Sequence, residues 1–496
     1  MKVLFLYPNL QGMNMLPPGI AILSACLKRE GFQVDLFDTT HWLIPGEEDF
    51  NSDKEKEKNL NVVPFDFAEQ QITLHTTDVF DDFENKVYSY SPDIIICSAT
   101  EDLFLNAIRL LKRVRKFQIP HVLGGVFATF SPNLALSFDE IDIVCVGEGE
   151  IALVELCHRI NKRLGYDDVT NLWIKKKDGS IVRNPVSKPV NINDNPLPDL
   201  SIFEEARLYR PMAGKVYRML PVETHRGCPF TCAFCNSPSK DVLYEAETGV
   251  SYFRVKTIEK VRQEIAHYVN DWGAEYLYFW ADTFLAMDEK HFHEFCDMYS
   301  EFELPFWMQT RPETLKASRI KRLQEIGLHR ISLGVEHGNE QFRRDIVNRR
   351  VKNNIMIEAM KIPHRYGVSF SVNNIIGFPK ETRKLAFDTV ELNRQIDADN
   401  YNCYAFMPFN GTPLRKLCEE LGYVEPNTIT RSLTRGAILD MPQFRRDEIE
   451  GLRRCFVLYV KFPKERWNEI RKAEALTPEG DMIFDRLRQE FMDIYY

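Results

Sequence analysis

The sequence lacks an apolar run close to the roughly 20 residues that a membrane-spanning helix needs. It also lacks a basic excess, because 63 Lys and Arg residues stand against 72 Asp and Glu residues, for a net charge of -9. Proteins that bind nucleic acid nonspecifically usually present a basic face, so this balance argues against that class while leaving room for a local basic pocket. We therefore expect no membrane span and no nucleic-acid partner.

The first residues do not have the pattern of an export signal. The apolar start MKVLFLYP ends at Pro8, and polar residues follow it without a small-residue cleavage site. We interpret this start as the first strand of a cytoplasmic protein. The eleven cysteines agree with that interpretation, because most of them, such as Cys97 and Cys145, stand alone in apolar runs where Cys is usually a small core residue.

The first 190 residues of the 496-residue chain predict an α/β domain. Short apolar runs alternate with helical patterns, which is typical of a doubly wound, Rossmann-like parallel sheet covered by helices on both faces. Such sheets bind ligands at the carboxyl ends of their strands. Small and polar residues gather at those ends, and the candidate ligand contacts are Asn9, Ser98, Thr100, Gly124, Gly125, Thr129, Gly147, Glu148 and Gly149.

Two glycine-rich strand ends, at 124–129 and 147–150, are expected one strand apart. Ordinary strand-to-helix turns would explain either one alone, whereas the two together favour a large ligand that the backbone approaches closely. Residues 41–80 form an insertion whose charge run, SDKEKEK, favours a solvated loop. Residues 191–215 begin with a stretch rich in Pro, Asn and Asp without periodicity, so we assign them to a linker.

Three cysteines cluster within eight residues: Cys228, Cys232 and Cys235, in a CxxxCxxC spacing. A closed structural zinc site needs four ligands, and no fourth Cys or His follows at finger spacing, since His225 lies just upstream at the wrong spacing. Three thiolates instead suit a four-iron, four-sulfur cluster with one iron left open to bind a substrate or cofactor. A zinc site and three unligated core cysteines are the alternatives.

Residues 216–420 repeat strand and helix in six units, and folds built from such units place their chemistry at the carboxyl ends of the strands. Polar or small residues follow those strands, at Asp282, Gln309, Arg311, Glu336, Asn374 and Gly377. From residue 421 the alternation stops. Amphipathic stretches rich in Phe, Tyr and Trp then predict a small helical domain over 421–496.

Three segments of the first domain resemble the cobalamin-binding domain that precedes the catalytic domain in a large class of radical S-adenosylmethionine enzymes. They read PPGIAILSACLKREGFQVDLFD, GGVFATFSPN and VCVGEGEIALVEL. The mutase type of this domain carries a DxHxxG loop whose His ligates cobalt, whereas the loop from Asn9 to Gly12 here has no His. The resemblance then implies that the lower cobalt face meets water or a protein loop, for which Thr100–Phe104 is the candidate.

The cysteine loop resembles that of the radical S-adenosylmethionine superfamily, with Phe234 just before the third cysteine and a strand before the loop. The whole chain is thus similar to cobalamin-dependent members. This resemblance implies a six-unit partial (β/α) barrel over residues 216–420. It also implies a 4Fe–4S cluster, S-adenosylmethionine and cobalamin as cofactors. By this resemblance Cys228, Cys232 and Cys235 ligate the cluster. The implied S-adenosylmethionine contacts are Phe234, Asp282, Gln309, Arg311, Glu336, Asn374 and Gly377.

Some of these residues also have a structural interpretation. The family resemblance puts Asp282 at the methionine amine, but an Asp at this place equally fits a helix cap. Arg311 and Glu336, expected at polar groups of methionine or ribose, equally fit a structural ion pair. His225 and His337, the latter where the family often has Ser, are candidate catalytic residues, although a lone His more often has a structural role.

The resemblance implies an oxygen-sensitive methyltransferase. A 5′-deoxyadenosyl radical would activate an unactivated carbon of a small molecule or natural product, and methylcobalamin would supply the methyl group. An external low-potential donor of the flavodoxin or ferredoxin type is the expected electron source. A non-methylating oxidative cyclase or ring-rearranging enzyme is the alternative within enzymes, and a non-catalytic sensor that binds cluster and cobalamin is the alternative of another class.

Overall fold

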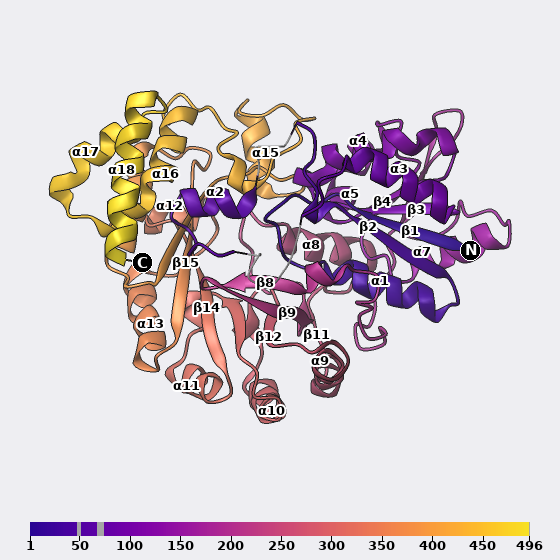
Figure 1. Ribbon diagram of the computed structural model, residues 1–496, viewed down its shortest axis with the longest axis horizontal. Coiled ribbons are helices and arrows are strands. Elements are labelled where there is room, and N and C mark those ends of the chain that lie inside the picture. Colours follow the sequence, from indigo (N-terminus) through magenta and orange to yellow (C-terminus); the bar gives the residue numbers. More distant parts are fainter. Residues whose placement is uncertain (47–50, 67–73, 496) are drawn as a thin grey trace.

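The computed structural model describes residues 1–46, 51–66 and 74–495. Two seven-stranded sheets dominate the fold, and a group of helices at the C-terminus packs beside the second sheet (Figure 1). The fold class is therefore α/β, with the three parts in the order that the sequence predicts. Among the described helices, none is both long and apolar enough to cross a membrane.

The N-terminal sheet has the strand order β2-β1-β3-β4-β5-β6-β7. Its first five strands are parallel, β6 pairs antiparallel with β5, and β7 pairs antiparallel with β6. The strands are β1 (Lys2–Tyr7), β2 (Gln33–Asp38), β3 (Ile94–Ser98), β4 (His121–Gly124), β5 (Ile143–Cys145), β6 (Leu172–Lys175) and β7 (Ile181–Arg183). The main helices are α1 (Pro18–Arg29), α3 (Val79–Tyr90), α4 (Phe104–Val114), α5 (Val126–Phe130), α6 (Pro132–Leu136) and α7 (Ala152–Asn161).

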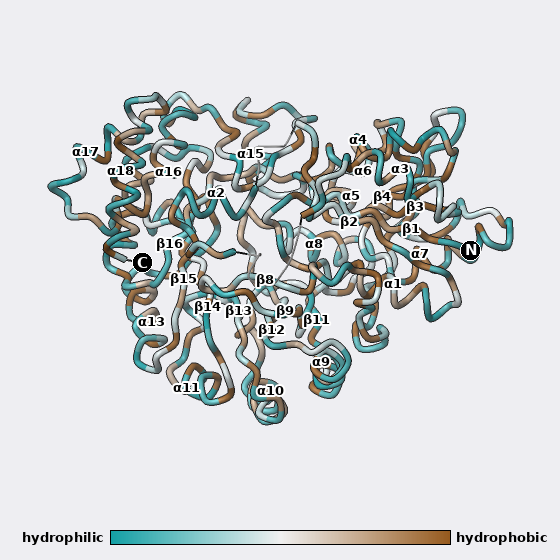
Figure 2. Tube along the Cα trace, in the orientation of Figure 1, coloured by the Kyte–Doolittle hydropathy of each residue, from teal (hydrophilic) through white to brown (hydrophobic). Residues whose placement is uncertain are grey.

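Alternation along β1 explains why helices cover both faces of this sheet. Val3 and Phe5 pack with residues of α1 and α7, whereas Leu4 and Leu6 pack with residues of α3 and α4. Both faces are consequently apolar, and Figure 2 shows the predominantly hydrophobic residues of β1, β3 and β4. This double burial is the physical reason that the strands read as continuous apolar runs.

The second sheet has the order β16-β15-β14-β13-β12-β9-β8. Its six parallel strands are β9 (Lys215–Glu223), β12 (Tyr276–Trp280), β13 (Phe306–Thr310), β14 (Leu328–Glu336), β15 (Ser369–Ile376) and β16 (Asn400–Ala405), and β8 (Tyr209–Met212) adds an antiparallel edge. The sheet curls, but β8 and β16 do not pair, so the barrel is partial and has six parallel units. Strand β8 lies inside the segment that the sequence assigns to a linker.

Helices cover the outside of this curled sheet (Figure 1). They are α9 (Ile258–Trp272), α10 (Glu289–Tyr299), α11 (Ala317–Glu325), α12 (Glu340–Asp345), α13 (Asn353–Arg365) and α14 (Arg383–Asn393). Helix α8 (Asn236–Thr248) instead lies between the two sheets, and its Tyr244 packs with residues of the N-terminal domain. The C-terminal part adds α15 (Pro413–Glu420), α16 (Arg446–Lys461), α17 (Trp467–Ala473) and α18 (Pro478–Tyr495). Helix α16 packs against β16 and α14, so this helical part extends the barrel wall.

The insertion differs from the predicted solvated loop in the part that is described. Residues 51–66 contain helix α2 (Ser52–Lys58), and Leu60 and Asn61 after it are buried. Asn61 Nδ2 donates a hydrogen bond of 3.1 Å to the carbonyl of Tyr401 in β16. Further on, Val63 lies against Gly214 in the β8–β9 turn. The segment therefore runs from one edge of the partial barrel toward the other; residues 47–50 and 67–73 lie outside the described residues.

Candidate functional site

The carboxyl edges of the two sheets face each other, and contacts between their loops hold them there. Phe130, after β4, lies so close to Gly411 that a Cβ at that glycine would come within 2.3 Å of its ring. Glu101, after β3, accepts hydrogen bonds from Asn410. The Glu148 amide, after β5, donates a hydrogen bond of 2.9 Å to the Tyr244 hydroxyl on α8. Ligands bound at the two edges would therefore face each other.

The cysteine loop begins directly after β10 (His225–Arg226), which pairs with β11 (Arg254–Val255). Cys228, Cys232 and Cys235 are the three partly exposed cysteines of the chain, whereas the other eight are buried. Cys235 is the N-cap of α8, and its Sγ accepts a hydrogen bond from the Ser237 amide. A helix N-terminus favours a thiolate there.

These three thiols fit a 4Fe–4S cluster with one open iron. They share one short loop, are partly open to solvent, and offer three sulfur ligands. A closed zinc site would need a fourth ligand, and the sequence places no further Cys or His at finger spacing. Burial outweighs the helix N-terminus and the Ser237 amide and raises the pKa of the Cys235 thiol to about 12, so ligation must release a proton from it.

Two arginines lie beside the cysteine loop. Arg311 Nη1 is 3.6 Å from Cys232 Sγ, and its guanidinium lies 3.8 Å from the centre of the Phe230 ring. Arg349 pairs with Glu336 at 2.7 Å, while Arg311 pairs with Glu313. The predicted alternative, an ion pair between Arg311 and Glu336, is therefore wrong, because each has another partner.

Glu336 and Arg349 have features of a ligand-binding pair. Glu336 has a φ of 64°, a left-handed conformation that is uncommon for a residue with a side chain and that clusters at functional sites. Burial raises the pKa of its carboxyl group. Arg349 is buried, and its Nε has no hydrogen-bond partner within the part of the chain that the structure describes. This unsatisfied donor fits a polar ligand such as S-adenosylmethionine.

Asp282 lies on the other side of the cysteine loop. Its carboxylate accepts a hydrogen bond from Ser237 at the start of α8, and the neighbouring Thr283 Oγ1 lies 3.5 Å from Cys228 Sγ. The cap of the next long helix, α10, is Asp288, so the helix-cap alternative for Asp282 is wrong. Gln309 Nε2 donates to the carbonyl of Ala281, the residue before Asp282. Asp282, Gln309, Arg311 and Glu336 thus gather at the carboxyl edge with the cysteines.

Three other predicted S-adenosylmethionine contacts have different surroundings. Asn374 is fully buried and bonds with the Asn393 side chain and the Asn402 carbonyl. The Gly377 amide donates to the Glu381 carboxylate. Phe234 lies near Phe378, with ring centres 6.3 Å apart. Their roles stay predictions.

The two candidate histidines also stay predictions. His337 is fully buried, lies 3.0 Å from Glu381 through Nε2, and accepts a hydrogen bond from the Asn339 amide. These contacts are those of a structural histidine. His225 is buried with no partner for its Nε2 among the described residues, and burial lowers its pKa to about 4. It is therefore neutral at physiological pH.

At the N-terminal edge, the predicted loops are close together. Gly125 has a φ of 107°, and a Cβ there would lie 2.5 Å from the Ala99 carbonyl oxygen, so only glycine fits. Thr129 joins the two glycine-rich loops, because its hydroxyl donates to the Gly125 carbonyl and accepts from the Gly147 amide. A Cβ at Gly147 would meet the Tyr244 hydroxyl at 2.5 Å.

The remaining predicted residues of this edge mostly contact their own domain. Asn9 is fully buried; its Nδ2 donates to Met13 and Thr40, while its Oδ1 has no partner in the described part of the chain. Thr100 donates to the Asp102 carboxylate. Ser98 and Gly124 end the neighbouring strands β3 and β4. Gly149 packs against Leu23 and Leu153. An orphaned amide oxygen and close glycine backbone fit a large, amide-rich ligand such as cobalamin.

Sequence reasoning missed several residues of this junction. Tyr244, Arg226 and Arg254 contact the 147–150 loop from the barrel side, and Arg349 pairs with Glu336. Lys240 lies on α8 between Ser237 and Tyr244, and burial lowers its pKa. Arg226, a basic residue two positions before the first cysteine, was the available signal. A cavity of about 250 Å³ at the opposite, amino end of β16 is not part of this junction.

Comparisons with known proteins agree with this arrangement. A family model for the B12 binding domain matches residues 12–157, and one for the Radical SAM superfamily matches residues 222–392. "Uncharacterized methyltransferase PH0819" of Pyrococcus horikoshii is 24% identical over 84% of this chain and 88% of its own length. The anaerobic magnesium-protoporphyrin IX monomethyl ester cyclase of Rubrivivax gelatinosus is 26% identical over 90% of this chain and 77% of its own.

Two solved structures share the fold. The radical S-adenosylmethionine methyltransferase TsrM from Kitasatospora setae superposes with a TM-score of 0.62 at 16% identity, over 86% of this chain and 76% of TsrM. The cobalamin-dependent S-adenosylmethionine radical enzyme OxsB superposes with a TM-score of 0.65 at 14% identity, over 99% of this chain and 71% of OxsB.

The fold and the junction define an α/β protein in which a B12-binding domain faces a radical SAM domain across their carboxyl edges. The chain belongs to the cobalamin-dependent radical S-adenosylmethionine enzymes. Its cofactors are a 4Fe–4S cluster, S-adenosylmethionine and cobalamin.

Proposed function

We propose that this chain methylates an unactivated carbon of a small molecule. The observation that carries the proposal is the contact between the two edges, which brings the predicted cobalamin loops at 124–129 and 147–150 to the barrel edge that carries the cysteine loop. When bound, the cluster with S-adenosylmethionine supplies hydrogen abstraction, and cobalamin supplies methyl transfer. These two chemistries meet at one substrate only if the two edges face each other.

The residues of the chain have four tasks in this proposal. Cys228, Cys232 and Cys235 hold the cluster. Asp282, Gln309, Arg311, Arg349 and Glu336 orient S-adenosylmethionine through their charges and hydrogen bonds. The contacts of Glu101 and Tyr244 keep the domains together and exclude water from the junction. The exposed Trp280 side chain at the end of β12, 40% accessible, offers an apolar surface to a substrate.

Relatives of known activity support methyl transfer. They include the cytidylyl-2-hydroxyethylphosphonate methyltransferase of Streptomyces wedmorensis, 18% identical over 86% of this chain, and the hopanoid C-3 methylase of Methylococcus capsulatus, 23% identical over 59%. We further propose that the protein acts in the cytoplasm and takes electrons from an external low-potential donor of the flavodoxin or ferredoxin type.

The test is product analysis under anaerobic, reducing conditions. Reconstituted protein is incubated with S-adenosylmethionine carrying a deuterated methyl group and with small-molecule extracts. We expect one new compound that carries the label, with S-adenosylhomocysteine and 5′-deoxyadenosine formed in equal amounts. The variant with all three cysteines changed to Ala serves as the control and should yield none of these. A product without label would exclude methyl transfer.

A second candidate is the oxidative cyclase reaction. It is favoured by the cyclase of Rubrivivax gelatinosus and by that of Cereibacter sphaeroides, which is 29% identical over 73% of this chain. It predicts 5′-deoxyadenosine without S-adenosylhomocysteine in the same experiment.

A further inference from the structure

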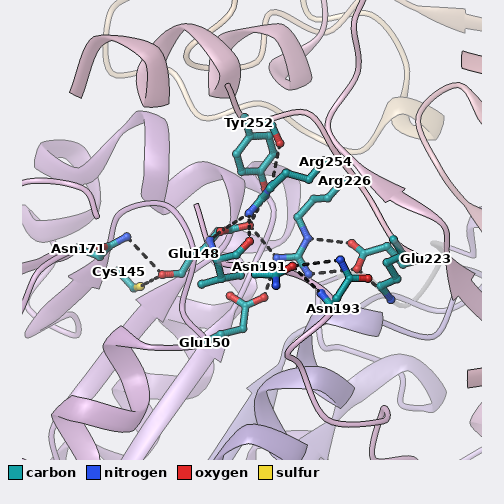
Figure 3. A network of polar contacts seen from close by, with 12 residues as sticks. Cys145, Glu148, Glu150, Asn171, Asn191, Asn193, Glu223, Arg226, Tyr252 and Arg254 are labelled. Carbon is teal, nitrogen blue, oxygen red and sulfur yellow. Dashed lines mark hydrogen bonds and ion pairs between the residues drawn. The ribbon is translucent and has the colours of Figure 1, made fainter. Parts of the chain in front are cut away.

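A chain of buried charges crosses the junction between the two domains (Figure 3). The charged residues come from the loop after β5, from the end of β9, from β10 and β11 beside the cysteine loop, and from α9. Its carboxylates are Glu148, Glu150, Glu223 and Glu264, and its cations are Arg226, Arg254 and Lys256. None of these side chains is more than 16% exposed.

Glu148 has no polar atom free for a cofactor. Its Oε1 is 2.6 Å from Arg254 Nη2 and 2.8 Å from Arg226 Nη1, and its Oε2 accepts from the Val190 amide at 2.8 Å. Its own amide donates to Tyr244, and its carbonyl accepts from Asn171. The predicted cobalamin contact at this residue is thus occupied by protein on every side.

Arg226 is the centre of the chain of charges. Its guanidinium reaches Glu148 at 2.8 Å, Glu150 at 2.6 Å and Glu223 at 2.8 Å. It lies two residues before Cys228, the first cysteine of the cluster loop. One rigid planar side chain therefore connects the cobalamin edge with the cluster loop.

The contacts continue away from the junction and anchor it. Glu223 also pairs with Lys256 at 3.3 Å, and Lys256 pairs with Glu264 on α9 at 2.6 Å. Because the charges are buried, displacing one of them leaves its partner as an unpaired buried charge, which destabilises the folded state. The network therefore resists displacement of one domain against the other more strongly than exposed ion pairs would.

We infer that Glu148 and Arg226 are positioning residues that fix the separation between the bound cobalamin and the cluster. This role concerns the geometry of the cofactors and goes beyond the proposed methyl transfer. It holds for either reaction and needs only that both cofactors bind, so its failure is distinguishable from the failure of the proposed function.

The experiment measures the distance between the two paramagnetic centres, cob(II)alamin and the one-electron-reduced cluster, by pulsed EPR on the full chain. The first variant is Glu148→Gln, which removes the negative charge that pairs with both Arg226 and Arg254. The second is Glu150→Gln, which removes a negative charge that pairs with Arg226 alone. Glu155→Gln on α7 is the matched control, since it breaks an exposed pair with Arg159 in the same domain. Iron content and cobalamin affinity are measured for each variant.

We expect a distance distribution roughly twofold wider in Glu148→Gln, a smaller widening in Glu150→Gln, and none in the control. A merely stabilising role would lower the unfolding midpoint and leave the distance of the folded fraction unchanged. If Glu148→Gln does not fold, Glu150→Gln decides the question. Wild-type distributions in the glutamine variants that fold would overturn the inference, as would selective loss of cobalamin affinity in Glu148→Gln, which would make Glu148 a direct contact.

Discussion

Glu101, in the loop after β3, accepts hydrogen bonds from both the backbone and the side-chain nitrogen of Asn410, each at 2.8 Å. The Thr430 amide donates a third, at 2.9 Å. Asn410 follows the last barrel strand, so this one carboxylate joins the loop expected beneath cobalt to the far side of the barrel mouth. Together with the Tyr244–Glu148 contact, it holds the cobalamin edge at two separate points.

Glu101→Ala should weaken the attachment between the loop after β3 and the residues that follow β16. The change leaves three N–H donors without this partner, one buried on Thr430 and two partly buried on Asn410, at roughly 1–3 kcal/mol for each that water does not reach. We expect a lower urea midpoint and faster amide hydrogen exchange at 406–412, with the iron content unchanged. Glu247→Ala, an exposed site on α8, is the control and should alter neither. Unchanged exchange at 406–412 would show that the barrel holds this loop by itself.

Replacing Cys228, Cys232 and Cys235 together by Ala should remove the cluster. The wild type, reconstituted anaerobically, should be brown and hold about four irons per chain, because three thiolates suit a cluster with one open iron. The variant should hold almost none while keeping its circular dichroism spectrum. Cys296→Ala, which changes a buried cysteine on α10, should keep the iron. Stoichiometric zinc in the wild type would contradict the assignment.

The bound cob(II)alamin should lack a nitrogen ligand. Asn9 occupies the loop where mutase-type domains carry the cobalt-binding His, and its amide nitrogen is bonded to Met13 and Thr40. His41, just after β2, is the histidine nearest this edge in sequence; it is buried, and burial together with Arg207 lowers its pKa to about 4. We expect EPR spectra without nitrogen superhyperfine splitting in the wild type and in His41→Ala. Splitting that disappears in His41→Ala would identify His41 as the ligand.

Features coded by neighbouring residues were predictable from the sequence. The apolar runs predicted the central strands of the N-terminal sheet, since burial on both faces leaves no polar position to obscure them. The cysteine loop was recognisable because its three ligands lie within eight residues. The polar residues after β12, β13 and β14 could be placed together, because parallel strands bring their carboxyl ends to one edge.

Features that depend on distant partners were not predictable. The charge run SDKEKEK reads as solvated, yet the residues after it are buried because Asn61 meets Tyr401, far along the chain. Arg311 and Glu336 were candidates for an ion pair, but in the structure Glu336 pairs with Arg349 and Arg311 pairs with Glu313. No pattern of neighbouring residues indicates that Arg226 pairs with Glu148, because the two side chains meet only in the folded arrangement of the two domains.

Glu223 makes the stability of the junction depend on pH. Burial alone would raise the pKa of this carboxyl group, but Arg226 and Lys256 lower it to about 2, from 4.5. A carboxyl group with a depressed folded-state pKa stabilises the fold above its unfolded pKa, and this contribution is lost as the pH falls through the folded value. The shift corresponds to on the order of 3 kcal/mol for this buried group.

Glu223→Gln should therefore lower the unfolding free energy near neutral pH, and its difference from the wild type should shrink between about pH 4.5 and about pH 2. The measurement is urea unfolding of both proteins across that range. Glu289→Gln is the matched control, because hydrogen bonds from Lys316 and Arg319 lower the pKa of Glu289 to about 2 as well, but this carboxylate is exposed. Solvent screens the ion pairs of Glu289, so Glu289→Gln should change the unfolding free energy little at any pH. A difference for Glu223→Gln that stays constant across the range would mean that its effect comes from packing rather than from charge.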